Sequence, residues 1–309
     1  MKIIMLDRKT LGFDANVDIF NDLGEFISYD VTFPNQVEER IKNADIVITN
    51  KVVITKEHMD NSSLKLICIS ATGMNNVDLE HAKKSNIEVK NVAGYSTSSV
   101  VQLSFAMMFH FIQKLSYYKK YVDDGKWEQS DIFTHIDEPF YDLDNKRLGI
   151  IGLGNIGENL AKKAQAFDCE VVYYSTSGAN NNSKYKQVSL EELLESSDII
   201  SIHCPLNDKT QDLLNYENMK SIKKGAILLN LGRGGIINEN DLAKIIDEQE
   251  IYCGIDVVSK EPILSSNPLL KVKNKEQLLL TPHIGWASIE ARNRLIKAVA
   301  KNIETFKTK

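Results

Sequence analysis

The sequence contains few of the residues that mark fibrous, disulfide-rich or strongly charged proteins. Its 309 residues include only six prolines and sixteen glycines, which excludes collagen-like and low-complexity architectures. The four cysteines are scattered and never form Cys-x-x-Cys, so we expect reduced, individually buried thiols rather than a disulfide framework or a zinc site. The net charge of −5 gives no electrostatic reason to expect a nucleic acid or an anionic membrane as a partner.

Long apolar runs are also scarce. The first ten residues carry Asp7 where a signal peptide would be apolar, so we interpret them as a strand and expect a cytoplasmic protein. Residues 91–113 lack Asp, Glu, Lys and Arg but include polar side chains such as Gln102 and His110. A membrane span needs roughly 20 predominantly apolar residues. We therefore interpret Ser98 to about Asp123 as a long helix buried between domains rather than as a span.

What remains is the composition of a folded α/β protein. Hydrophobic residues make up 43% and charged residues 26%, and the length favours two domains. Apolar runs alternate with amphipathic helical patterns in both halves, which predicts parallel strands joined by helices. The first helix is expected to end near Gly24. The expected strands lie at residues 2–7, 44–49, 63–70 and 87–92, then at 147–152, 170–175, 198–206, 225–232, 253–258 and 277–285, and a last helix at 288–306.

One segment has no clear periodicity. Residues 124–145 are polar and irregular, and loops of this length usually have a function. Contact with a second copy of the chain and cover for a substrate are both open for this segment.

The most specific motif is a glycine loop, G-x-G-x-x-G, formed by Gly152, Gly154 and Gly157. It follows an apolar strand, opens an amphipathic helix and is completed by a second strand, which is the context that a dinucleotide-binding fingerprint requires. The first glycine permits a tight turn, the second lets backbone approach a pyrophosphate, and the third lets the helix pack on the strand. The helix N-terminus then offers N–H groups to the anion. The alternative is a tight turn without a ligand.

Three ionisable residues follow the carboxyl ends of later strands, where doubly wound sheets bind their ligands. They are Arg233, Glu261 and His283. Taken singly, each has an ordinary explanation as a surface charge, a solvated loop residue or a neighbour of a helix cap. Together with the glycine loop they form a coherent candidate site.

These motifs resemble those of the D-isomer-specific 2-hydroxyacid dehydrogenase family. The similar strings are GLGNIG, NLGRGGIINENDLAKII, GIDVVSKEP and TPHIGWASIEAR, and the likeness covers nearly the whole chain. Within the family, ATGMNNVD, NVAGYSTSSV and PHIGWAS resemble the glycerate dehydrogenase, or hydroxypyruvate reductase, branch most closely.

The resemblance implies an α/β fold with two doubly wound domains. A Rossmann dinucleotide-binding domain at residues 98–283 would be inserted in a flavodoxin-like substrate domain at residues 1–97 and 284–309, with the active site in the cleft between them. The helix that starts at Ser98 would help to build a homodimer. No metal, nucleic acid or membrane is expected as a partner.

The expected reaction moves a hydride between a nicotinamide cofactor and a small 2-keto acid or its D-2-hydroxy acid, most specifically hydroxypyruvate and D-glycerate. Arg233 offers a forked cationic donor for the substrate carboxylate, and His283 is the natural proton donor to the keto oxygen. Glu261, bonded to the other ring nitrogen, would stabilise the imidazolium. The resemblance adds the backbone N–H groups of Thr72, Gly73 and Met74 as further holders of the carboxylate.

Two alternatives remain for this reading of the function. One is a glyoxylate or broad 2-keto acid reductase. The other is a dinucleotide-sensing protein without catalytic activity on the same fold, which turnover by the purified protein would distinguish.

The cofactor contacts depart from the fingerprint at one place. An acid is expected at the end of the second strand of the dinucleotide unit, but Ser175, Thr176 and Ser177 stand there. Their hydroxyls could donate to a phosphate, with Lys184 and Lys186 as possible helpers. We therefore expect NADH to be used and NADPH to be tolerated within about tenfold in kcat/KM, a gap of about 1.4 kcal/mol.

The expected cofactor site collects residues from the glycine loop and from later strand ends. By family likeness, Asp256 would bond the nicotinamide carboxamide. The full set is Gly152, Gly154, Asn155, Ile156, Gly157, Ser175, His203, Cys204, Pro205, Leu231, Gly232, Arg233, Asp256, His283 and Gly285.

Overall fold

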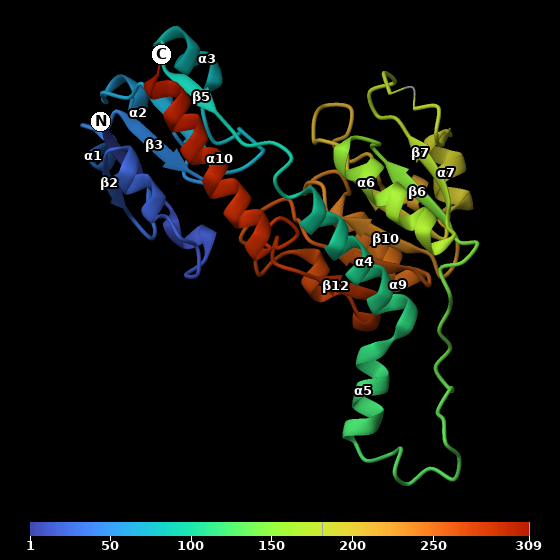
Figure 1. The fold of residues 1–309 in the computed structure, drawn as a ribbon. Helices are drawn as coiled ribbons and strands as arrows, with labels where there is room; N and C mark the ends of the chain where they lie inside the picture. Colours follow the sequence, from blue (N-terminus) through green and yellow to red (C-terminus); the bar gives the residue numbers. More distant parts are fainter. Residues whose placement is uncertain (181, 309) are drawn as a thin grey trace. The chain divides into compact units, whose positions relative to one another are not determined.

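The structure is a computed structural model that describes residues 1–180 and 182–308. The chain divides into two compact units, each built around its own parallel sheet (Figure 1). Unit 1 comprises Met1–Ser96 and Trp286–Lys309, and unit 2 comprises Thr97–Gly285. An α/β architecture with parallel sheets is therefore confirmed.

Unit 1 contains a five-stranded sheet with the strand order β2-β1-β3-β4-β5. This is the flavodoxin-like order 2-1-3-4-5 of a doubly wound sheet. Its strands are β1 (Lys2–Met5), β2 (Glu25–Ser28), β3 (Ile46–Thr49), β4 (Leu66–Ile69) and β5 (Glu88–Lys90). Its helices are η1 (Arg8–Leu11), η2 (Asp18–Leu23), η3 (Pro34–Gln36), α1 (Val37–Ile41), α2 (Lys56–Asp60), α3 (Leu79–Lys84) and α10 (Ile289–Lys307).

Alternate side chains of the central strands of unit 1 enter two separate cores. On one face, Ile46 and Ile48 pack with η2 and with α10. On the other face, Val47 packs with α1, α2 and α3. Both faces of β3 and β4 are buried, which explains why these strands read as continuous apolar runs in the sequence.

A helix does end near Gly24, as predicted, but it is a short 3-10 helix rather than one continuous helix. The structure has two short 3-10 helices, η1 and η2, separated by a turn in which Gly12 has a φ of +83°, and then the edge strand β2. A left-handed glycine interrupts a continuous helix here. The sequence reading missed β2 because none of its four residues is buried, so the strand lacks the apolar run of a central strand.

Unit 2 contains a seven-stranded sheet with the order β12-β11-β10-β9-β6-β7-β8. Its strands are β6 (Arg147–Ile151), β7 (Glu170–Tyr174), β8 (Lys186–Gln187), β9 (Ile199–Ile202), β10 (Ile227–Asn230), β11 (Tyr252–Ile255) and β12 (Leu278–Leu280). Its helices are α4 (Thr97–Gln113), α5 (Leu115–Asp123), α6 (Asn155–Ala164), η4 (Gln165–Phe167), α7 (Leu190–Ser196), α8 (Tyr216–Met219), α9 (Glu239–Glu248), η5 (Pro268–Lys271) and η6 (Lys275–Gln277).

All strands of this second sheet are parallel, but the direction in which successive strands are added reverses between β6 and β9. From β6 the chain moves outward through β7 to β8, and from β9 it moves the other way through β10 and β11 to β12. One face of the sheet is covered by α4 and α6 and the other by α7, α8 and α9. A reversal of this kind opens a crevice at the carboxyl ends of the two central strands, which is where such sheets bind ligands.

The predicted continuous helix from Ser98 to about Asp123 is also corrected. Helix α4 ends at Gln113, Lys114 adopts a left-handed conformation with a φ of +46°, and α5 starts at Leu115. Eight of the seventeen residues of α4 are buried, whereas no residue of α5 is. The break falls where the helix leaves the sheet, because beyond Gln113 no core side chains continue the apolar face.

Residues 115–142, here called the arm, project from the rest of unit 2 (Figure 1). No residue of the arm is buried. It is held together by a small aromatic cluster, in which the ring of His135 stacks on Tyr121 with a centroid distance of 3.7 Å and bonds the hydroxyl of Tyr117 at 2.8 Å. Within the described part of the chain, every helix is too short or too polar to span a bilayer.

The four cysteines are free and buried, as the sequence predicted. Burial raises the pKa of the Cys204 thiol to about 11, so this group is protonated at neutral pH.

Candidate active site

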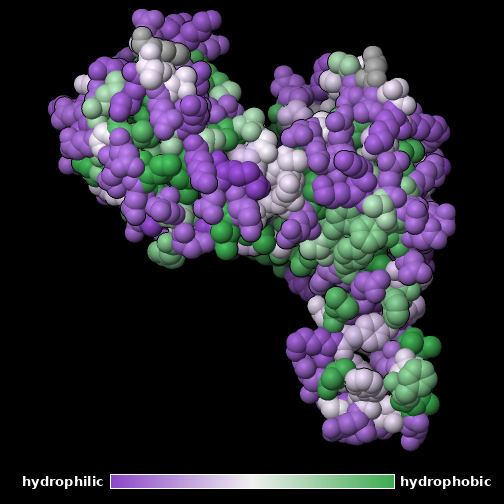
Figure 2. Space-filling model, viewed as in Figure 1, coloured by the Kyte–Doolittle hydropathy of each residue, from purple (hydrophilic) through white to green (hydrophobic). Residues whose placement is uncertain are grey.

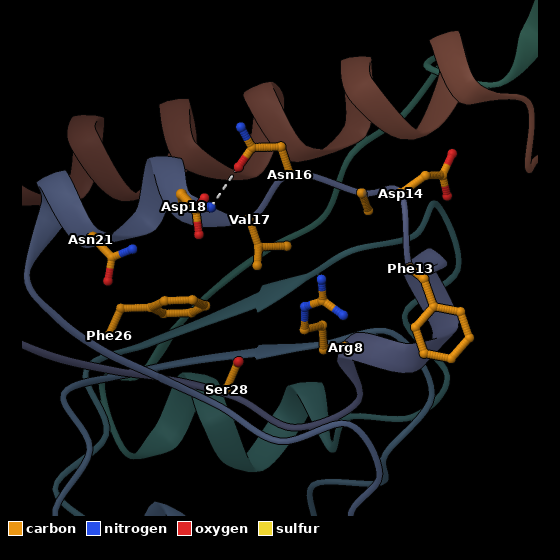
Figure 3. Close-up of a pocket in the computed structure, with 10 residues that line it drawn as sticks. Arg8, Phe13, Asp14, Asn16, Val17, Asp18, Asn21, Phe26 and Ser28 are labelled. Carbon is orange, nitrogen blue, oxygen red and sulfur yellow. Dashed lines mark hydrogen bonds between the residues drawn. The ribbon is translucent and has the colours of Figure 1, made fainter.

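Unit 1 holds a cavity of about 550 Å³ beside the edge strand β2, between η1 and η2 (Figure 3). Two of its charged groups have local partners: Asp14 accepts from Arg292 at 2.8 Å, and Arg8 lies 3.9 Å from Asp30. Asn16 caps the start of η2 by accepting from the Asp18 N–H at 2.9 Å. No residue of the candidate motifs lines this cavity, so we place the candidate site elsewhere.

A cavity of about 630 Å³ lies in unit 2 at the carboxyl ends of β6, β7 and β9, where the strand order reverses. Its lining brings together the glycine loop, the end of β7 and the loop that follows β9. The lining residues are Gly152, Leu153, Gly154, Ser175, Thr176, Ser177, Asn180, His203, Cys204, Pro205, Asn207, Asp208 and Lys209. This is the position at which a doubly wound sheet binds a dinucleotide.

Each of the three glycines of the loop is required, or tolerated, for a different structural reason. Gly152 has a φ of +93°, and a Cβ there would lie 2.7 Å from the Cys204 backbone nitrogen. A Cβ on Gly157 would lie 2.5 Å from the Gly152 carbonyl oxygen. A Cβ on Gly154 would meet no atom within 4 Å, although the backbone there lines the cavity. The fold therefore requires the outer two glycines, and Gly154 leaves space for a ligand at the start of α6.

Two buried polar atoms in the cavity wall lack a partner. Among the described residues, neither Ser175 Oγ nor His203 Nδ1 makes a hydrogen bond. The His203 Nε2 atom bonds Ser201 Oγ at 2.8 Å, and burial lowers the pKa of this imidazole to about 4, so the ring is neutral. Buried polar groups are almost always bonded. A polar ligand such as a dinucleotide would supply both missing partners, so the residues present fit the expected cofactor.

The lysines that the sequence analysis considered as helpers are not in this cavity. Lys186 pairs with Glu192 at 2.8 Å, and Lys184 lies 5.4 Å above the ring of Tyr185. The lysine that lines the cavity is Lys209, together with its neighbour Asp208. The sequence analysis named His203, Cys204 and Pro205 at the start of this loop but missed Asp208 and Lys209 further along it.

His283 and Glu261 lie together in unit 2. His283 Nδ1 is 2.7 Å from Glu261 Oε2, and the Val258 N–H donates to the other oxygen of Glu261 at 3.2 Å. The His283 side chain is 25% exposed. The carboxylate therefore engages Nδ1 and leaves the other ring nitrogen, Nε2, free of Glu261.

Asp256 holds the loop that carries His283. Its carboxylate accepts from the Thr281 hydroxyl at 2.6 Å and from the N–H groups of Ile284 and Gly285, both at 2.8 Å. Its carbonyl accepts from the His283 N–H at 2.9 Å, and His283 has a left-handed φ of +54°. Burial raises the pKa of the Asp256 carboxyl. The sequence analysis gave Asp256 a cofactor contact only and missed this structural function.

Arg233 sits on an exposed turn after β10. The buried side chain of Asn230 supports this turn, because its amide donates to the Arg233 carbonyl at 3.0 Å and its oxygen accepts from the Gly232 N–H at 3.1 Å. The Arg233 guanidinium donates to the Gly232 carbonyl at 2.8 Å. Leu231 is buried below the turn. Asn230, which the sequence analysis also missed, thus presents the guanidinium at the edge of the sheet.

Thr72, Gly73 and Met74 form a loop after β4 in unit 1. Asn91 donates to the Thr72 carbonyl at 2.7 Å, and the Thr72 hydroxyl donates to the Val92 carbonyl at 3.0 Å. Within residues 1–180 and 182–308, no protein acceptor bonds the three N–H groups of this loop. Consecutive free N–H groups are suited to an anion.

The chain is similar to known proteins over nearly its whole length. Residues 105–285 match the family model described as D-isomer specific 2-hydroxyacid dehydrogenase, NAD binding domain. The chain is 39% identical to a hydroxypyruvate reductase of Blautia hydrogenotrophica, over 99% of this chain and 97% of that protein. It is 34% identical to a glycerate dehydrogenase of Methylorubrum extorquens, over 99% and 96% of the two chains.

Among solved structures, an acyclic imino acid reductase in complex with NADPH and D-Arg has a TM-score of 0.86 and 28% sequence identity, and the match covers 100% of this chain and 97% of that one. The family model covers more than half of the chain, and both relatives are more than 30% identical over nearly its whole length. This protein therefore belongs to the D-isomer specific 2-hydroxyacid dehydrogenase family.

Proposed function

We propose that this member of the family reduces hydroxypyruvate to D-glycerate with a nicotinamide dinucleotide and also catalyses the reverse reaction. The observation that carries the proposal is the 2.7 Å pair of His283 and Glu261, in the same unit as the glycine loop. The hydroxypyruvate reductase and glycerate dehydrogenase among the full-length relatives support this choice of substrate.

The proposed chemistry depends on a proton at His283. The nicotinamide ring, when bound, supplies or accepts the hydride. Because Glu261 engages Nδ1, the proton for the keto oxygen comes from Nε2 of His283, which takes it back in the oxidative direction. The Glu261 carboxylate bonds Nδ1 and thereby orients the ring. Arg233 holds the substrate carboxylate through its guanidinium fork. The contribution of Thr72, Gly73 and Met74 to the same carboxylate stays a prediction.

We also propose that the arm is covered by a second copy of the chain in a homodimer. The arm exposes large apolar side chains, among them Phe133, which is 90% exposed, and Ile132 and Ile136. Figure 2 shows separate hydrophobic groups, in green, among purple and white ones on the projecting part of unit 2. A segment without buried residues does not supply the apolar burial that ordering it requires. A self-complementary contact with a second arm would supply it, in a twofold dimer of the kind most common among soluble oligomers. The free, buried cysteines support a cytoplasmic location.

The substrate assignment is tested with a panel of hydroxypyruvate, glyoxylate, pyruvate and phenylpyruvate, each with both reduced cofactors. We expect hydroxypyruvate to give the highest kcat/KM, at least about tenfold above pyruvate and phenylpyruvate, a gap of about 1.4 kcal/mol in transition-state binding. Equal efficiency on all four acids would support a broad reductase instead. Absence of turnover on the whole panel would support a dinucleotide-sensing protein.

Replacing the proton donor should separate catalysis from binding. In His283→Ala we expect kcat to fall by about 10²–10⁴-fold, because general acid catalysis has this size, while NADH affinity stays near that of the wild type. Steady-state kinetics and NADH fluorescence titration measure the two quantities. Glu261→Gln, which keeps the shape of the side chain but removes its charge, should retain more kcat than His283→Ala, because the imidazole that donates the proton is still present. A His283→Ala enzyme that retained more than about a tenth of kcat would exclude this acid.

The glycine loop offers a matched pair of substitutions. Gly154→Ala adds a methyl group where no atom lies within 4 Å, so we expect the free energy of unfolding to stay within about 0.5 kcal/mol of the wild type and the Kd for NADH to rise. Gly157→Ala places its methyl group against the backbone, so we expect a loss of stability of about 1–3 kcal/mol. Urea unfolding and NADH titration check both variants. Unchanged NADH affinity in Gly154→Ala would contradict a pyrophosphate at this position.

The arm contact is tested by charging its apolar surface. The wild type should have twice the chain mass of 34.9 kDa in light scattering, and Phe133→Asp combined with Ile136→Asp should yield monomers. The control is Phe13→Asp in unit 1, which removes another highly exposed phenylalanine outside the arm. A double variant that stays dimeric, or a monomeric wild type, would refute the proposed interface.

A further inference from the structure

The end of β7 has no acidic side chain to read the adenosine ribose. In dinucleotide-binding sheets an acid here bonds the ribose hydroxyls and repels a 2′-phosphate. In this protein the three residues after β7 are Ser175, Thr176 and Ser177, and all three line the cavity. The cavity therefore lacks the usual feature that excludes a phosphorylated ribose.

One of these hydroxyls is already desolvated without a partner. Ser175 is only 8% exposed, and within the described residues its Oγ makes no hydrogen bond. A buried hydroxyl left unpaired destabilises the folded chain, because it has lost its bonds to water. An oxygen of the ribose or of a phosphate on it would remove this cost, so the wall of the cavity is prepared for a polar ligand at this point.

A cation reaches the same cavity from a different loop. Lys209 follows β9, and its loop is anchored by Thr210, which is fully buried and donates from its hydroxyl to the Pro205 carbonyl at 2.7 Å. The Lys209 N–H donates to the Asn207 side chain at 2.9 Å. Among the described residues, no carboxylate oxygen lies within 4.0 Å of the Lys209 ammonium nitrogen. Lys186, in contrast, pairs with Glu192. An ammonium group such as that of Lys209 is suited to a phosphate.

An acid in the same loop opposes this cation. Asp208 is exposed and also lines the cavity, so it lowers the local affinity for a second phosphate. The charges of Lys209 and Asp208 nearly balance at long range. The phosphate can therefore be held by direct contact with the ammonium, but it is not strongly favoured over a free ribose.

We propose that Lys209 determines how well NADPH binds relative to NADH. Together with the Ser175 hydroxyl it binds the 2′-phosphate of NADPH, so the enzyme uses both dinucleotides. This inference rests on the nicotinamide cofactor of the proposed function and not on the choice of keto acid. It differs from the sequence expectation, which looked for the cation near Lys184 and Lys186.

The test measures nucleotide binding without a substrate. Isothermal titration gives the Kd values of NADH, NADPH, 5′-AMP and 2′,5′-ADP for the wild type and three variants. In Lys209→Gln we expect the Kd of NADPH and of 2′,5′-ADP to rise about tenfold more than the Kd of NADH and of 5′-AMP. Asp208→Asn should lower the Kd of the two 2′-phosphorylated nucleotides. Lys186→Gln, whose partner Glu192 lies outside the cavity lining, is the matched control and should change neither ratio.

The ratio of NADPH to NADH binding decides the proposal. An unchanged ratio in Lys209→Gln would overturn it, as would the same change in Lys186→Gln. A wild type that binds NADH a thousandfold better than NADPH would overturn it as well. Failure of the substrate panel with normal nucleotide binding would instead overturn only the proposed reaction, because the titration contains no keto acid.

Discussion

The parallel direction of the strands is the constraint on which the candidate site depends. All strands of unit 2 run the same way, so the loops that follow them open at one edge of the sheet. The order reverses between β6 and β9, and the two loops at that point approach so closely that Gly152 has no room for a Cβ against Cys204. The cavity opens at this point because the chain leaves the two central strands in opposite directions.

Buried polar groups near the candidate site fall into two kinds: those that hold the loops in place and those that are available to a ligand. The Asp256 carboxylate accepts hydrogen bonds from Thr281, Ile284 and Gly285. It thereby holds the loop in which His283 has a left-handed conformation. Ser175 and His203 lie in the cavity wall with atoms that no neighbour in the described residues bonds. Because unpaired buried polar groups are costly, a fold tolerates them where a ligand completes them. Asp256 thus finds its hydrogen-bond partners within the chain, whereas Ser175 and His203 each keep one polar atom for a ligand.

The arm likewise has apolar side chains that the chain itself does not bury. Elsewhere in unit 2 the apolar side chains of helices and strands enter two cores on the two faces of the sheet. Beyond Lys114 the chain leaves the sheet and keeps its aromatic residues on the surface, where His135 and Tyr121 stack only on each other and their neighbours. Local stacking gives the arm its shape, but an ordered segment of this length needs burial that a single chain does not provide.

The sequence by itself determined the strands of both sheets that are buried on two faces, the glycine loop and the order of Arg233, Glu261 and His283, because continuous apolar runs and short motifs are local signals. It did not determine the edge strand β2, the break at Lys114 or the 3-10 turns near Gly12, since these lack an apolar period. Only the tertiary structure decided that Lys209 rather than Lys184 or Lys186 lines the cavity and that Asp256 supports the loop of His283. Both depend on loops that follow different strands, and parallel pairing brings such loops together irrespective of their separation in the sequence.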